Sequence, residues 1–72
     1  MSIMTITTNE DRAEAAYRAV EKFSDITGLE GEEMQTKISD LLCNLQHLAV
    51  EQGIEFSECL EQAYRHYETE TA

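Results

Sequence analysis

The sequence predicts an all-α protein, a small three-helix assembly over about residues 9–27, 32–52 and 58–69 with a loose N-terminal arm. Three observations lead to this fold class. The chain contains no proline. Its three glycines, Gly28, Gly31 and Gly53, stand where the apolar periodicity breaks. Between them, apolar residues recur at the three- and four-residue steps of a helix.

The arm is predicted over residues 1–8, because a lone β-prone stretch has no strand to pair with. Thr8 and Asn9 are suitable N-caps for the first helix. Acids follow them, where a helix N-terminus favours negative charge. Gly28 is predicted to end this helix. Its apolar stripe is narrow and consists of Ala13, Ala16, Tyr17, Val20 and Phe23.

The second helix is predicted to begin near Gly31, with Glu32 and Glu33 in its first turn, and to run to Gln52. At about 100° per residue, seven apolar side chains fall within roughly a third of its circumference. They predict the central core helix and are Met34, Ile38, Leu41, Leu42, Leu45, Leu48 and Ala49. Gly53 followed by Ile54 matches a glycine stop with an apolar residue that packs back.

Ser57 is the predicted N-cap of the third helix, and Glu58 falls in its first turn. The apolar stripe of this helix is Leu60, Ala63, Tyr64 and Tyr67. Short connections favour antiparallel neighbours. The sequence therefore predicts a single helical domain over residues 9–69, followed by a tail over residues 70–72.

The charge balance excludes several classes of function. The chain has 15 acids against 5 Lys and Arg, a net charge of -10. Six acids oppose three bases in residues 1–31, and nine oppose two in residues 32–72, so the halves carry -3 and -7. Phosphate backbones and anionic lipids repel such a surface, which argues against nucleic-acid and membrane binding. With no signal peptide or membrane-spanning run recognised, the expected location is the cytoplasm.

A domain of this size buries only about 60% of the surface of its unfolded chain, so help from a partner is expected. Cys43 and Val50 lie on the far side of the second helix from its core stripe. A second copy of the chain could cover that side, which predicts a homodimer.

Polar side chains suggest few sites for chemistry, and no cofactor is predicted. Asp40, Asn44, His47 and Glu51 share one flank of the second helix, where they could bind a divalent metal or form a solvated face. Cys43 and Cys59, even with His47 and His66, lack the short ligand spacings of zinc sites. Two reduced thiols are the simpler interpretation.

Tyr64, Arg65, His66 and Tyr67 form a cluster of residue types that often anchor interfaces. At helical spacing, Tyr64 and Tyr67 can equally be the last layer of the core.

The run from Asp40 to Ala49, continuing through Gly53 and Ile54 to Leu60, resembles the later helices of MazG-like all-α nucleotide pyrophosphohydrolases. The resemblance implies Mg²⁺ held at Glu30, Glu33 and Asp40. Lys37, however, stands where the partner glutamate belongs, and the acid pairs lie closer together than in that family. The alternative function is therefore a MazG-like nucleotide pyrophosphohydrolase or its inactive remnant.

As a small, acidic and helical chain, the protein also resembles the orphan proteins of phages and other mobile elements, anti-CRISPR proteins among them. Many of these use a negative surface to occupy a nucleic-acid path on a host complex. The leading hypothesis is a non-enzymatic inhibitor that binds a basic surface of a protein or nucleoprotein complex. The expected partner-binding residues are Glu51, Glu55, Glu58, Glu61, Tyr64 and Tyr67.

Overall fold

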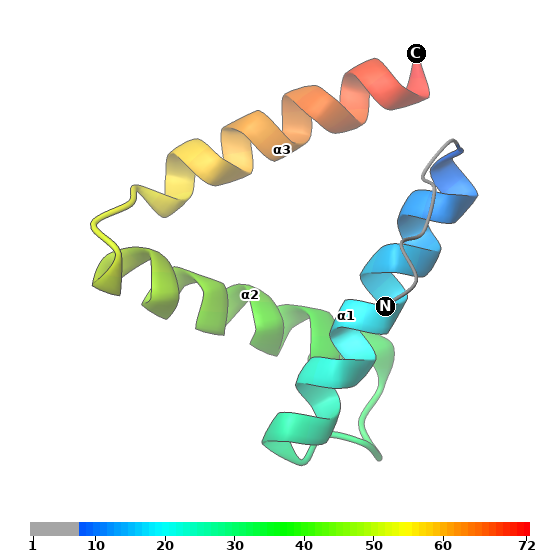
Figure 1. Cartoon of the computed structure of the whole chain (residues 1–72), viewed down its shortest axis with the longest axis vertical. Helices are drawn as coiled ribbons and strands as arrows, with labels where there is room; N and C mark the ends of the chain where they lie inside the picture. Colours follow the sequence, from blue (N-terminus) through cyan, green and yellow to red (C-terminus); the bar gives the residue numbers. More distant parts are fainter. Residues whose placement is uncertain (1–7) are drawn as a thin grey trace, which may run out of the picture. The chain divides into compact units, whose positions relative to one another are not determined.

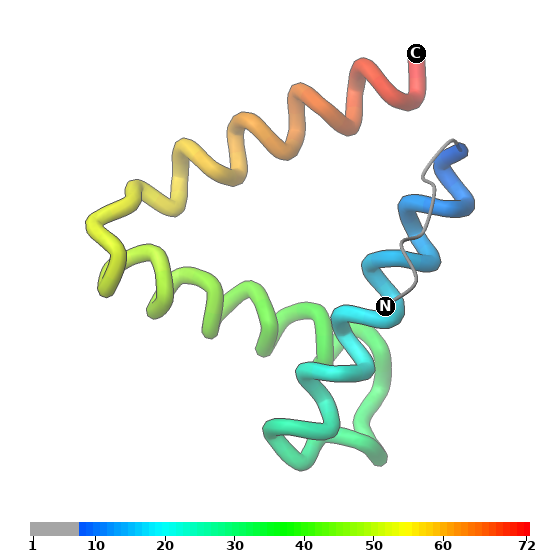
Figure 2. The backbone as a smooth tube through the Cα atoms, in the orientation of Figure 1, coloured from blue at the N-terminus to red at the C-terminus, as the bar shows by residue number. Residues whose placement is uncertain are grey.

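The computed structural model describes residues 8–72, and three helices account for most of them (Figure 1). Helix α1 spans Asn9–Thr27, α2 spans Met34–Glu51 and α3 spans Phe56–Thr71. No strand occurs in residues 8–72, and the all-α prediction is confirmed. The predicted arm falls, except for Thr8, outside the described residues. Two short connections join the helices (Figure 2).

The chain divides into two compact units, and the division lies inside α2. The first unit ends at Ile38 and contains α1, the first connection and the start of α2. The second unit begins at Ser39 and contains the rest of α2 together with α3.

The sequence signals at the two ends of α1 are confirmed. Thr8 is the N-cap, and its Oγ1 accepts a hydrogen bond of 3.0 Å from the backbone N–H of Asp11. Gly28 ends the helix with a left-handed φ of 75°. The backbone N–H of Leu29 then donates to the carbonyl of Ser24 at 3.0 Å. The Ser24 carbonyl also accepts the backbone N–H of Gly28, so two donors close the last turn of the helix at the same oxygen.

Two predicted helix starts are wrong by two residues. Helix α2 begins at Met34 rather than 32, because the first helical hydrogen bond runs from the Lys37 N–H to the Glu33 carbonyl. Helix α3 begins at Phe56, so Ser57 lies inside the helix and is not the N-cap. Glu55 is the N-cap and makes no side-chain capping hydrogen bond. The early start places the half-buried Phe56 on the helix itself, which side-chain capping rules do not foresee.

Polar groups make up much of the buried interior of the first unit. Val20 and Ser24 of α1 are buried, and so is Lys37 of α2. The Lys37 Nζ lies 3.2 Å from Glu21 Oε1 and 3.5 Å from Glu21 Oε2. The Lys37 side chain is only 8% exposed, whereas Glu21 is 36% exposed. The pair therefore joins α1 to the start of α2 with the cation on the buried side.

Replacing Glu21 by Gln should lower the free energy of unfolding by about 1–3 kcal/mol, because the buried ammonium of Lys37 loses its charged partner. Urea unfolding followed by circular dichroism measures this change. Glu14→Gln is the matched control, since Glu14 Oε1 also lies 3.2 Å from a cation, Arg18. In that pair the Arg18 side chain is 66% exposed and the Glu14 side chain 49% exposed. The control should cost no more than about 0.5 kcal/mol. Equal losses in both variants would contradict a stabilising role for the Glu21–Lys37 pair.

Ser24 is completely buried, and its Oγ has no hydrogen-bond partner among residues 8–72. Ser24→Ala should therefore raise the unfolding free energy, by about 1 kcal/mol or more, since it removes an unpaired buried hydroxyl and improves helix propensity. Ser39→Ala on the exposed surface of α2 gains the helix propensity alone and is the control. A thermal melt in which Ser24→Ala is less stable than the wild type would show that the hydroxyl is satisfied.

Candidate functional site

The turn between α2 and α3 builds the candidate site of the second unit. Gly53 has a left-handed φ of 70°, and its backbone N–H donates to the Val50 carbonyl at 3.2 Å. The N–H of Ile54 donates to the Ala49 carbonyl at 2.8 Å. These two bonds form the predicted glycine stop and fix the direction in which the chain leaves α2.

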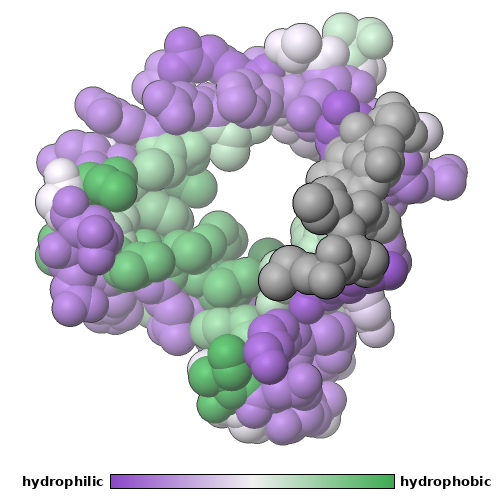
Figure 3. All heavy atoms as spheres, viewed as in Figure 1, coloured by the Kyte–Doolittle hydropathy of each residue, from purple (hydrophilic) through white to green (hydrophobic). Residues whose placement is uncertain are grey.

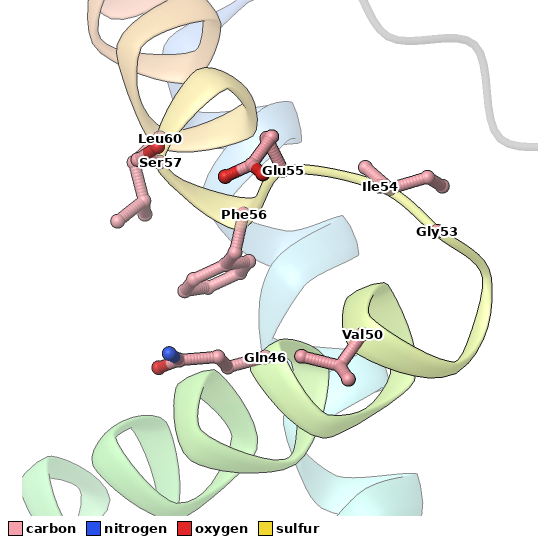
Figure 4. Close-up of a pocket in the computed structure, with 8 residues that line it drawn as sticks. All are labelled: Gln46, Val50, Gly53, Ile54, Glu55, Phe56, Ser57 and Leu60. Atoms are coloured by element: carbon pink, nitrogen blue, oxygen red, sulfur yellow. The ribbon is translucent and has the colours of Figure 1, made fainter.

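Phe56 lies at the point where α2 and α3 meet. Its ring points from the first turn of α3 toward α2, where Gln46 lies close by (Figure 4). Phe56 is half-buried, and Ala49 is the buried apolar residue of α2 beside the turn. The apolar contact between the two helices is therefore concentrated at this end of the hairpin.

Two surface hollows adjoin Phe56. One has a volume of about 570 Å³ and is lined by Gln46, Val50, Gly53, Ile54, Glu55, Phe56, Ser57 and Leu60 (Figure 4). The other has a volume of about 270 Å³ and is lined largely by apolar side chains, namely Leu45, Leu48, Ala49, Gln52, Ile54, Phe56 and Cys59. The first hollow combines apolar side chains with the polar groups of Gln46, Glu55 and Ser57, whereas the second is almost wholly apolar and suits contacts with apolar side chains.

Beyond the turn, α2 and α3 leave their apolar side chains exposed. Seven large side chains of the second unit are 40–63% exposed, and together they form what we call the α2–α3 apolar face: Leu42, Leu45, Leu48, Ile54, Leu60, Tyr64 and Tyr67. Apolar residues gather on the sides of α2 and α3 that face each other (Figure 3). Within the second unit, α2 is thus not the buried core helix that the sequence predicts. Tyr64 and Tyr67 are not a core layer either.

The acids of the second unit lie on its surface. The four predicted partner-binding acids, Glu51, Glu55, Glu58 and Glu61, are all exposed. Glu61 lies 3.9 Å from Arg65, a pair in which both side chains are more than half exposed. Seven acids and one Arg between Ser39 and Ala72 give this unit a net charge of -6. The end of α2, the turn and the first turns of α3 thus carry four exposed glutamates, which together we call the acidic surface.

The three acids of the alternative metal site do not lie on one structural element. Glu30 and Glu33 belong to the connection between α1 and α2, whereas Asp40 lies on α2. Within residues 8–72, no group of three or more His, Cys, Asp or Glu side chains is placed to hold a metal ion. Cys43 and Cys59 are exposed free thiols. Cys43 and His47 line a shallow hollow of about 320 Å³ with Gln46 and Val50.

No family model matches the chain, and neither the curated proteins nor the solved structures contain a significant match to it. None of the helices in residues 8–72 is long and apolar enough to cross a membrane.

Several important residues were not singled out by the sequence. Phe56 falls before the predicted start of the third helix at residue 58, although the structure places it between two helices, where it lines both hollows. In the sequence, Lys37 stands out only because it occupies the position where the MazG-like metal site has a glutamate. Its helical angle, about 60° from Met34 at 100° per residue, places it beside the apolar stripe and could have indicated a buried cation.

Gly53→Ala should lower the unfolding free energy by about 1–2 kcal/mol, because a side chain disfavours the left-handed conformation. An added Cβ meets no atom within 4 Å, so the cost comes from the backbone alone. Gly31→Ala is the control, since Gly31 has no positive φ and equally open surroundings. It should be neutral or stabilise by up to about 1 kcal/mol. Denaturant titration of both variants checks the difference, and equal stabilities would contradict the geometry of the turn.

Proposed function

We propose that the chain is a non-enzymatic protein-interaction module whose acidic surface occupies a basic, nucleic-acid-binding surface of a larger cytoplasmic protein complex. The observation that carries this proposal is the exposure of Glu51, Glu55, Glu58 and Glu61 on one helical hairpin. The only cation of the second unit, Arg65, already lies beside Glu61. Glu51, Glu55 and Glu58 have no such partner within residues 8–72 and can interact with external cations.

An Arg- and Lys-lined channel is the kind of partner that complements this surface. Opposite charges on two proteins accelerate their encounter and fix their relative orientation. Burial or pairing of these acids would weaken this effect. All four are exposed, and Glu51, Glu55 and Glu58 lie outside the Glu61–Arg65 pair. The proposed mode of action is therefore competition with nucleic acid for the same basic residues. Inhibitors encoded by mobile elements can act in this way.

The spacing of the charges supports a surface that extends beyond α3. Along α3, Glu58 and Glu61 are separated by about 4.5 Å of helix rise. Duplex DNA carries one charge per about 1.7 Å of its axis. One helix is thus too sparse a copy of a nucleic acid. Glu51 at the end of α2 and Glu55 in the turn add charges from outside α3, so the proposed surface includes both helix ends.

The test is a competition experiment on nucleic-acid-binding complexes from the cell of origin. The wild-type chain should displace labelled nucleic acid from its target, and this inhibition should weaken as salt rises. The combined variant Glu51→Gln, Glu55→Gln, Glu58→Gln and Glu61→Gln should inhibit at least about fourfold less well, since exposed charges contribute about 0.2–1 kcal/mol each.

The matched control removes the same number of charges from the first unit: Asp25→Asn, Glu30→Gln, Glu32→Gln and Glu33→Gln. These four acids are also exposed, so the net charge changes equally. Equal losses in the two variants would show that only the total charge matters and would reject the proposed surface. A separate assay incubates the chain with nucleoside triphosphates in the presence of Mg²⁺. Pyrophosphate release that Asp40→Asn abolishes would contradict the non-enzymatic part of the proposal.

A further inference from the structure

We infer that the α2–α3 apolar face is the surface on which a second copy of this chain packs, so that two helical hairpins close one shared core. This inference concerns a different surface from the proposed acidic one. It also differs from the dimer expected from the sequence, which placed the partner on the Cys43 and Val50 side of α2.

The area of the face agrees with the needs of a stable dimer. A fully exposed Leu or Ile side chain offers roughly 100 Å² of apolar surface, and an aromatic side chain offers about 150–250 Å². At exposures of 40–63%, five aliphatic side chains and two tyrosines leave about 500 Å² of apolar surface per copy. A protein interface of standard size buries about 800 Å² per partner, and homodimer interfaces are about 65% apolar. An interface of standard size would therefore use the whole face.

The geometry of the hairpin favours a partner of the same kind. The apolar stripes of α2 and α3 meet at Phe56 and are exposed beyond it. A second hairpin brings two helices with identical stripes, which can pack into the exposed part of the first. The same patch is then used on both copies, as in a twofold-symmetric interface. The result is a bundle of four helices around one core, an arrangement that apolar stripes on facing helices commonly stabilise.

The positions of the acids also favour a second copy over a basic partner on this face. At about 100° per residue, Asp40 and Glu51 lie roughly 120–140° from Leu45 around α2. By the same measure, Glu58 and Glu61 lie more than about 100° from the middle of the α3 stripe. These four acids therefore lie away from the apolar face, and only Glu55 lies at its edge, where it lines a hollow with Ile54 and Leu60. Packing of two copies leaves these four acids in water, whereas a basic helix would find few carboxylates beside it.

Sedimentation equilibrium over a range of protein concentrations gives the first measurement. We expect a monomer–dimer equilibrium that shifts toward the dimer as salt rises, because each second unit carries a net charge of -6 and salt screens the repulsion. This salt effect has the opposite sign from that expected for the acidic surface. A failure of the dimer and a failure of the proposed function are therefore distinguishable.

The two cysteines provide an internal comparison in the unmodified chain. Cys59 lines the hollow that continues the α2–α3 apolar face, whereas Cys43 lines a hollow elsewhere on α2. Both thiols are free and exposed in one copy. Alkylation followed by mass spectrometry should show that Cys59 becomes at least about tenfold less reactive as the dimer forms. Cys43 should remain equally reactive at every protein concentration.

Variants identify the face independently. Leu45→Gln combined with Leu48→Gln should raise the dimer dissociation constant at least about tenfold. Val50→Gln is the control, because Val50 is 73% exposed and lies outside the face. It should leave the constant unchanged. Circular dichroism checks that the helices persist, and if the double variant unfolds, the alkylation of the wild-type chain still decides.

Three results would overturn the inference. The first is a monomer at all concentrations with Cys59 reactive, which would leave the face open for a different protein. The second is a monomer with Cys59 protected, which would mean that the chain covers the face itself. The third is a dimer that protects Cys43 and is weakened by Val50→Gln, which would place the partner on the side expected from the sequence.

Discussion

The shortage of apolar partners in the second unit is the constraint on which the rest of the structure depends. Leu42, Leu45, Leu48, Ile54, Leu60, Tyr64 and Tyr67 remain roughly half exposed, while Ala49 is buried. Complete burial of such a side chain is worth about 1.5–3 kcal/mol, so about 1 kcal/mol each, or roughly 7 kcal/mol together, is not realised within the chain. A small protein has a total stability of only about 5–15 kcal/mol. An association that covers this surface can therefore change the stability of the whole molecule.

Different interactions join the helices in the two units. In the first unit, an ion pair joins the two helices, since the buried Lys37 of α2 lies beside Glu21 of α1. In the second unit, an aromatic ring makes it, since Phe56 points toward α2 directly after the turn (Figure 4). The glycine stop at Gly53 sets the direction of the chain there, so Phe56 meets α2 only near its end. The same turn therefore makes the contact and limits its extent.

The local features could be predicted from the sequence because each depends on neighbouring residues. Thr8 as a cap and Gly28 and Gly53 as stops follow from backbone chemistry that acts within a few positions. The start of α3 was missed because Phe56 is placed by a contact with another helix, against the preference for a side-chain cap at Ser57. The exposure of α2 was missed for a related reason. A seven-residue stripe shows that a helix has an apolar side, but it does not show whether the same chain covers it.

Apolar and acidic surfaces are separated on the second unit, and this separation allows one small protein to make two kinds of contact. An apolar face whose seven members carry no charge can pack on a copy of itself with little desolvation of charge, since Glu55 lies only at its edge. Acids on the remaining surface stay hydrated and can act at a distance on cations. If both contacts form, the dimer presents Glu51, Glu55, Glu58 and Glu61 twice, which increases the density of charge that a single α3 cannot supply. Self-association would then be part of how the acidic surface reaches the charge density of a nucleic acid.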